Sequence, residues 1–382
     1  MGNSVYPSTL PQLATRMGHL QPTHQRLPPL QSAAASRLVA AVLLLIAMGT
    51  GKAQNSQRSR AQPGTIRIQR VAVLSGGGNG AHLRLTSWVT RDSRGRYYAA
   101  GLTDPARIGI YDPRGRFLQT MGRGGGGPGE FTHVQRVFVS PGDSLFAFDR
   151  SQQISVFSPE HRFVRSFRPP GQVRDIRFVG SRLILSIGFP EQVPALVATD
   201  RQGRRLGTLG SASPDLRDRP RLIAPADSGR MWAGFKHQYR LELLNPDGRR
   251  ERAFNRALPW FGPDRPRSAT RQPGSIRDLA YDPRSRSIRV LLYREDMSFR
   301  PRARRGSAGG EGPVAQLDEA DARARYEIYM EVLDSRSGRV VAHGDLNDRL
   351  IAGFLSPTEV YAHREDGDGS TVIDVWRIRL AP

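Results

Sequence analysis

After Thr65 the chain is a succession of short apolar runs separated by polar turn residues. The clearest example is 107–131, RIGIYDPRGRFLQTMGRGGGGPGEF. Its apolar run at 108–111 is followed by Asp-Pro-Arg-Gly at 112–115, which has the composition of a tight turn. A second apolar run at 117–121 leads into glycines that cannot hold regular structure. The pattern therefore predicts a β-hairpin followed by a long connection.

Weaker copies of this hairpin recur along the chain and are of two kinds. Hairpins of the first kind pair an apolar strand with a second strand that ends in a polar or small residue. Hairpins of the second kind have the form of the one within 107–131. Asp, Gly, Ser and Pro occupy the turn centres, as tight strand connections require. The six hairpins of the first kind are 87–101, 137–149, 176–188, 223–235, 279–294 and 352–364, and the five of the second kind are 109–122, 155–168, 196–210, 241–254 and 329–344.

Repeats of about 40–50 residues with several strands each are typical of β-propellers. A sixth hairpin of the second kind is incomplete, because only the strand 371–379 follows the last hairpin. Strand 66–74 has no partner of its own, and an open sheet edge favours aggregation. We therefore predict an all-β fold over 66–382, a six-bladed β-propeller of four-stranded blades whose ring closes when 66–74 pairs with 371–379. A seventh blade would need a hairpin at 295–325, but this polar, Gly-rich segment is predicted to be an insertion in blade five.

The N-terminal segment has the pattern of a secretory signal. No acidic residue occurs in 1–36. Arg37 then precedes an apolar run of 12 residues at 38–49, which is too short to span a bilayer. Gly51 and Ala53 supply small residues at the positions that signal peptidase requires. This order of a positive region, a short apolar region and small residues predicts export.

We expect a signal peptide at 1–53 that is cleaved after Ala53, and a polar, disordered linker at 54–65. The mature protein would then be periplasmic or secreted and would have no transmembrane span. Met17 is an alternative start of translation. An uncleaved membrane anchor is the alternative to a signal peptide, and N-terminal sequencing of the exported protein distinguishes the two.

Composition narrows the possible classes of function. The 40 glycines and 28 prolines favour many turns and short strands. The absence of cysteine excludes disulfides, zinc–thiolate sites, cysteine nucleophiles and a lipid-modified N-terminal cysteine. The formal charge of +22 comes almost entirely from arginine. Such a charge suits nucleic acid, acidic polysaccharide or anionic lipid. However, the arginines are scattered, with no dense basic run interleaved with aromatics, so we expect them on solvated strand faces.

The segment 107–131 resembles the NHL repeat, which has an apolar strand, an Asp-x-x-Gly turn, a return strand ending in Gly, and a connection similar to Gly-Pro-Gly-Glu-Phe. The next segment, SLFAFDRSQQISVFSPEHRFVRSF at 144–167, is similar to the following repeat, with Asp149 where the family often has Asp. The resemblance is good over 107–168, faint over 175–254 and nearly absent beyond. It is greatest to secreted bacterial six-bladed propellers related to NHL proteins. Such a resemblance implies the fold firmly and the function weakly, since propellers serve as binding platforms, lyases, lactonases and structural modules.

The sequence contains no clear catalytic or metal-binding motif. The glycine-rich run at 124–129 lacks the Gly-Lys-Ser/Thr ending of a phosphate loop, and no helix pattern follows it. We interpret it as a turn between blades. The histidines show no metal-binding spacing, and no Gly-x-Ser-x-Gly elbow occurs. We therefore predict no catalytic residue, no metal site and no cofactor.

Propeller geometry points to a candidate binding face. The loops between second and third strands and the connections that enter each blade converge over the central channel. The hairpin alignment places polar residues at these points, with an excess of cations, and the insertion at 295–325 is expected to overhang them. A solvated channel mouth without a ligand is the alternative. The predicted ligand-binding residues at the channel mouth are Glu130, His133, Asp149, Arg150, Lys236, His237, Arg294, Glu295, Arg364 and Glu365.

Three functions are compatible with these features. The first is an exported, monomeric, non-enzymatic binding or scaffold module for a protein, a peptide or an anionic glycan. The second is a metal-dependent lactonase or lyase, in which Asp149, Glu295 and Glu365 would approach a hard cation. Arg294 and Arg364 beside them would repel that cation. The third is nucleic-acid binding, with its steep salt dependence, but export removes most of the natural partners.

Overall fold

The computed structural model describes residues 63–77, 82–190, 193–210, 220–258, 260–261, 274–295 and 323–381. The chain divides into two compact units, 1–60 and 61–382, and every described residue belongs to the second. The predicted signal peptide at 1–53 and most of the predicted insertion at 295–325 lie outside the described residues. The described residues form 24 strands and almost no helix, so the all-β prediction is confirmed.

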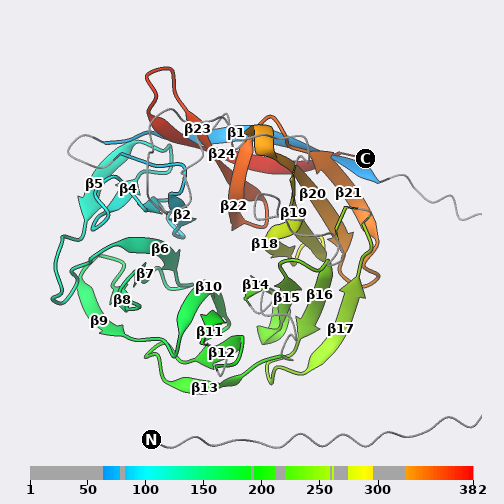
Figure 1. Ribbon diagram of the computed structural model, residues 1–382, viewed down its shortest axis with the longest axis horizontal. Coiled ribbons are helices and arrows are strands. Elements are labelled where there is room, and N and C mark those ends of the chain that lie inside the picture. Colours follow the sequence, from blue (N-terminus) through cyan, green and yellow to red (C-terminus); the bar gives the residue numbers. More distant parts are fainter. Residues whose placement is uncertain are drawn as a thin grey trace, which may run out of the picture. The chain divides into compact units, whose positions relative to one another are not determined.

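Four of the sheets contain four antiparallel strands each, and strands that are consecutive in the chain are neighbours in the sheet. Figure 1 shows these sheets following one another in chain order around a common centre, with the first strand of each sheet innermost. We number them groups one to four. Group one holds β2 (Trp88–Arg91), β3 (Tyr97–Ala100), β4 (Ile108–Tyr111) and β5 (Phe117–Met121); group two holds β6 (Val134–Val139), β7 (Leu145–Asp149), β8 (Ile154–Phe157) and β9 (Phe163–Phe167); group three holds β10 (Gln172–Val179), β11 (Arg182–Phe189), β12 (Leu196–Thr199) and β13 (Arg205–Thr208); group four holds β14 (Arg221–Pro225), β15 (Met231–Phe235), β16 (Arg240–Leu244) and β17 (Arg250–Asn255).

The remaining sheet has eight strands in the order β18-β19-β20-β21-β1-β24-β23-β22. It consists of two four-stranded halves, which we number groups five and six. Group five holds β18 (Ser275–Asp282), β19 (Ser287–Glu295), β20 (Tyr326–Asp334) and β21 (Val340–Asp345); group six holds β22 (Leu350–Ser356), β23 (Glu359–Glu365), β24 (Thr371–Ala381) and β1 (Gly64–Leu74).

Strand β1 joins the two ends of the described chain. It pairs antiparallel with β24 over nearly its whole length, so the predicted pairing of 66–74 with 371–379 is observed. Its first residues also pair in parallel with β21, where Gly64 lies opposite Ala342. The strand therefore begins at Gly64, inside the segment expected to be a linker. This double pairing fastens group six to the outer strand of group five.

The middle strands of the groups are buried on both faces. In β3 and β7 every residue is buried. Because side chains alternate between the faces of a strand, each of these strands contributes to two different hydrophobic clusters. Leu145 and Ala147 of β7 pack against group one, whereas Phe146 and Phe148 pack against group three. A group of this kind must be covered on both sides to be stable.

Six hydrophobic clusters of the described residues provide this cover. Five of them lie between groups that follow one another in the chain, from one–two to five–six. The sixth cluster joins group six to group one and contains Leu74 and Ile373 together with Val89 and Tyr97. Every group therefore packs against two others.

Several arginines form ion pairs with aspartates in the turns between strands. In the β4–β5 turn, Asp112 Oδ1 accepts the backbone N–H groups of Arg114 and Arg116 at 2.9 and 2.8 Å. Its Oδ2 accepts Arg116 Nε at 2.6 Å. The same aspartate-to-arginine pair, four residues apart, closes the turns Asp92–Arg96 and Asp200–Arg204. Each of these arginines pairs with an aspartate of its own strand connection.

The contact between β1 and β21 can be tested at Gly344. A Cβ at this position would lie 2.8 Å from Ile66 Cβ, so Gly344→Val should push β1 away from β21. We expect the free energy of unfolding in urea to fall by about 1–3 kcal/mol. Gly207 of β13 is the matched control, because a Cβ there would have no atom within 4 Å. An equal loss in Gly207→Val and Gly344→Val would contradict this close packing.

Candidate functional site

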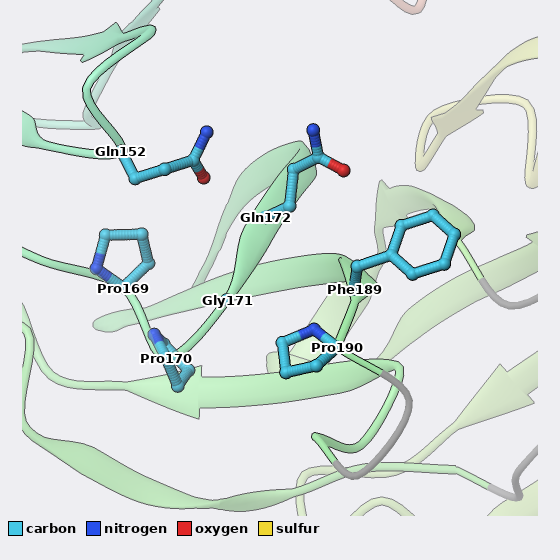
Figure 2. A pocket seen from close by; sticks show the side chains of 7 residues that line it. All are labelled: Gln152, Pro169, Pro170, Gly171, Gln172, Phe189 and Pro190. Atoms are coloured by element: carbon cyan, nitrogen blue, oxygen red, sulfur yellow. The ribbon is translucent and has the colours of Figure 1, made fainter.

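A pocket of about 510 Å³ lies at the connections β7–β8, β9–β10 and β11–β12. Two of these connections join second to third strands and one enters a group, so the pocket lies among the kinds of loop from which the binding face was predicted. Figure 2 shows the two prolines of the β9–β10 connection on one side of Gly171 and the β11–β12 residues on the other. The pocket is lined by Gln152, Pro169, Pro170, Gly171, Gln172, Phe189 and Pro190.

The apolar part of the pocket depends on local backbone geometry. Pro169 and Pro170 restrict the chain just before β10 begins. A Cβ at Gly171 would lie 2.4 Å from the carbonyl oxygen of Phe189, so only glycine lets β10 and β11 run this close. The Phe189 side chain ends β11 and is 50% exposed. In Figure 2 the ring points away from Pro169 and Pro170. A large ring exposed to solvent is a candidate contact surface for a ligand.

Two amide side chains add polar groups to this surface (Figure 2). Gln152 follows β7 with a positive φ of 63°. Its Oε1 is buried and accepts no hydrogen bond within the described part of the chain. Gln172 Oε1 accepts a hydrogen bond from Arg174 Nη2 at 2.8 Å. The pocket is a shallow, open depression that combines an apolar wall with amide groups.

Asp149, a predicted mouth residue, fastens the β5–β6 connection to the end of β7. Its two carboxylate oxygens accept the backbone N–H and the hydroxyl of Thr132, and the backbone N–H groups of His133 and Ser151. Burial raises the pKa of Asp149, but these hydrogen bonds, above all those from Thr132, outweigh it and hold the pKa below its ordinary value. Arg150 donates its backbone N–H to the His133 carbonyl at 2.9 Å. These hydrogen bonds bring three of the predicted mouth residues together: His133, Asp149 and Arg150.

Glu130 stabilises the glycine-rich connection between β5 and β6. It accepts Gly127 N–H at 2.8 Å, and its other oxygen accepts Arg123 Nε at 2.8 Å. The Gly127 N–H and then the Arg123 cation lower the pKa of Glu130. A Cβ at Gly125 would lie 2.1 Å from Glu130 Oε2. The glycines therefore make room for this carboxylate, and the run connects two groups, as the sequence indicated.

The predicted residues at the end of β19 bind neighbouring side chains. Arg294 forms an ion pair with Glu327, which lies opposite it on β20, and stacks 5.3 Å from the Tyr329 ring centre. The hydrogen bond to Glu327 raises the pKa of Arg294. Glu295 is buried and lies 3.2 Å from Arg325. These two residues hold the start of β20 against β19.

The other predicted residues lie in groups four and six. Arg364 forms an ion pair with Asp374 at 3.1 Å across β23 and β24. The Lys236 carbonyl accepts a backbone hydrogen bond from β18, which links groups four and five. His237 is half-buried and Glu365 is exposed. The Arg364 ion pair lies within group six.

Sequence reasoning missed a charged feature of the inner strands. The same doublet occurs as Val-Arg-Asp-Ile at 173–176 in β10 and as Ile-Arg-Asp-Leu at 276–279 in β18. A β-bulge falls at each doublet, where the register with the next strand shifts by one residue. In both copies the arginine is exposed and the aspartate is buried. A bulge re-aims side chains in this way.

Each of the two aspartates fastens its strand to the following group. Asp278 Oδ1 accepts Leu279 N–H at 2.8 Å, and its Oδ2 accepts Phe354 N–H of β22 at 2.8 Å. Asp175 accepts the N–H of the next residue at 2.9 Å and that of Ile223 in β14 at 3.4 Å. The aspartate of each doublet thus links two inner strands, β10 to β14 and β18 to β22.

Arg177 connects the two aspartates. Its Nη1 lies 2.8 Å from Asp175 Oδ1 and its Nη2 lies 3.3 Å from Asp278 Oδ1. Burial opposes the charge on Arg177, but the two carboxylates outweigh it and raise the pKa of the guanidinium. Burial raises the pKa of Asp175 even though Arg177 opposes this. The ion pair links groups three and five, which are not consecutive in the chain.

Two further arginines complete this centre. Arg136 of β6 follows an equivalent bulge, donates to the Arg174 carbonyl and lies 4.7 Å from the Trp88 ring centre. Burial lowers the pKa of Arg136. Arg277 lies 5.7 Å from the Tyr293 ring centre. We call the following residues the central charge cluster: Arg136, Asp175, Arg177, Arg277 and Asp278.

Within the described residues, no group of three or more His, Asp or Glu side chains is placed to hold a metal ion. Among the same residues, no helix has the length and apolar character needed to cross a bilayer.

Comparisons with known proteins show likeness of fold. A member of the DUF4221 family from Bacteroides vulgatus aligns over 84% of this chain and 100% of its own, with a TM-score of 0.53 and 10% identity. A proposed exported protein from Bacteroides fragilis aligns over 83% of this chain and 96% of its own, with a TM-score of 0.49 and 9% identity. No protein-family profile and no curated protein matches the sequence. At 10% identity the first likeness concerns the fold alone.

Stability should depend on pH through His363, which is buried in β23 and bonds the Ser87 carbonyl through Nε2 at 2.8 Å. Burial lowers the pKa of His363 from 6.5 to about 4. Between these pH values the unfolded chain binds a proton that the folded chain does not, so stability falls as the pH is lowered. We expect a loss of about 3 kcal/mol in urea unfolding between pH 7 and pH 4 from this residue.

His363→Gln is the control, because its side-chain amide retains a donor for the Ser87 carbonyl and does not titrate. A parallel loss of stability in the wild type and in His363→Gln would contradict this assignment.

Proposed function

We propose that the chain is an exported, NHL-like six-bladed β-propeller that acts as a non-enzymatic binding module. In this proposal the six groups are the six blades, and β1 closes the ring. The six hydrophobic clusters support it, because one of them joins group six to group one. The pairing of β1 with β24 supports it as well.

Export to the periplasm or beyond the cell rests on the signal pattern at 1–53. The exported protein is a monomer in this proposal.

The ligand in this proposal is a segment of a protein or a peptide, with an anionic glycan as the other ligand class. The observation that carries the proposal is the pocket lined by three prolines and by Phe189, which is 50% exposed. An apolar ligand side chain would gain free energy by covering this ring. Gln152 and Gln172 line the same pocket, and side-chain amides can hydrogen-bond the N–H and carbonyl groups of a peptide backbone. A peptide residue therefore offers both an apolar side chain and these polar groups.

The ten residues predicted for the channel mouth remain candidates for the surroundings of the ligand. The hydrogen bonds and ion pairs of the acidic residues among them argue against the alternative function of a metal-dependent lactonase or lyase. The Asp149 oxygens already accept four hydrogen bonds, and Glu295 pairs with Arg325. A hard cation would have to displace these donors.

Removal of the exposed ring should weaken peptide binding. Peptides selected on the wild-type protein from a random twelve-residue phage library should bind Phe189→Ala about 10-fold more weakly, because the buried apolar area is lost. The measurement is fluorescence anisotropy with the labelled peptide. Leu206→Ala is the matched control, because Leu206 is 56% exposed but lies on the outer strand β13. Selected peptides that bind Phe189→Ala as tightly as the wild type would contradict the assigned pocket.

A further inference from the structure

The two Arg-Asp doublets expose a pair of cations on the inner strands. At each bulge the aspartate turns into the core, while Arg174 and Arg277 remain exposed between buried neighbours. A structural role for the doublet needs only the aspartate, which makes the bonds to the next group. The bonds to the next group involve neither arginine side chain: Arg277 lies over the Tyr293 ring and Arg174 donates to Gln172.

The carboxylates near these arginines are already bonded. Asp278 accepts two backbone N–H groups and lies 3.3 Å from Arg177, and Asp175 has the equivalent set. Within the described residues, no carboxylate lies at ion-pair distance from Arg174 or Arg277. The central charge cluster contains three arginines and two aspartates, so one positive charge is in excess. An anionic ligand would balance it.

Arg174 connects this cluster to the pocket. Its Nη2 donates to Gln172, which lines the pocket, and its carbonyl accepts Arg136. A Cβ at Gly188 would lie 2.9 Å from Arg174 Nε, so the guanidinium lies against the strand that ends in Phe189. Arg174 therefore reaches the pocket through Gln172 and lies against Gly188, the residue before Phe189. A ligand seated on Phe189 would place its next groups beside Arg174.

We propose that Arg174 and Arg277 bind carboxylates, and that the ligand is an acidic peptide segment with an apolar side chain. The apolar side chain lies in the pocket at Phe189, and the carboxylates of neighbouring residues lie at Arg174 and, toward the centre, at Arg277. This inference rests on the proposed function, since it assigns the chemistry of the ligand at the same face. Charge complementarity selects an acidic peptide, and the planar fork of arginine suits carboxylate geometry.

The test uses the full exported chain and a fluorescein-labelled peptide, GEFEPEG, with GQFQPQG as the uncharged counterpart. We expect the wild type to bind GEFEPEG about 10-fold more tightly than GQFQPQG in fluorescence anisotropy at low salt. Arg174→Gln and Arg277→Gln should each remove most of this preference. Arg114→Gln, in the exposed β4–β5 turn, makes the same change of charge and should leave both affinities within about 2-fold of the wild type.

The outcomes separate this inference from the proposed function. If Phe189→Ala weakens GEFEPEG but the two central variants do not, the pocket binds peptide and the carboxylate assignment is wrong. If none of the three variants has an effect, the assigned face is wrong as well. Failure of GEFEPEG to bind overturns the inference, while library-selected peptides still test the pocket. Displacement of the peptide by a heparin octasaccharide that binds more tightly, through the same arginines, would also overturn it.

Discussion

The constraint on which this structure depends is that the middle strands are apolar on both faces. A strand such as β7 sends alternate side chains into two hydrophobic clusters, so neither of its faces can be left in water. Each four-stranded group must therefore pack between two others. The chain meets this demand for group one by placing β1 and β24 beside it, which brings the two ends of the described chain together. The turns and bulges serve this arrangement, because they set the register of each strand.

The candidate binding surface arises where this regular packing is interrupted. Pro169, Pro170 and Gly171 lie between groups two and three, where β10 and β11 approach too closely for any side chain at Gly171. Phe189 stands exposed at the end of β11. Bulges in the inner strands then turn aspartates inward and leave arginines outside. The bulges thus have two roles. They fasten the groups together through the buried aspartates, and they place arginine side chains on the candidate binding face.

The strands were predictable because apolar alternation and Asp-Gly turns are local signals. The pairing of β1 with β24 followed from an unpaired strand at each end of the repeat. The parallel contact of Gly64 with β21 was not predictable, since it depends on how two groups meet. The predicted site used strand ends, and residues such as Asp149 and Arg294 there have local partners. The doublets at 174–175 and 277–278 were visible as charge within apolar strands, but only the bulges show which side chain is buried.

Hydrogen–deuterium exchange of the wild-type protein, with and without a bound acidic peptide, tests most directly that the protein binds its ligand through this face. The account predicts slower exchange at 169–174, at 187–190 and at 275–279, with little change in the outer strands β5, β9 and β13. Protection confined to those outer strands, or spread evenly over the six groups, would contradict it.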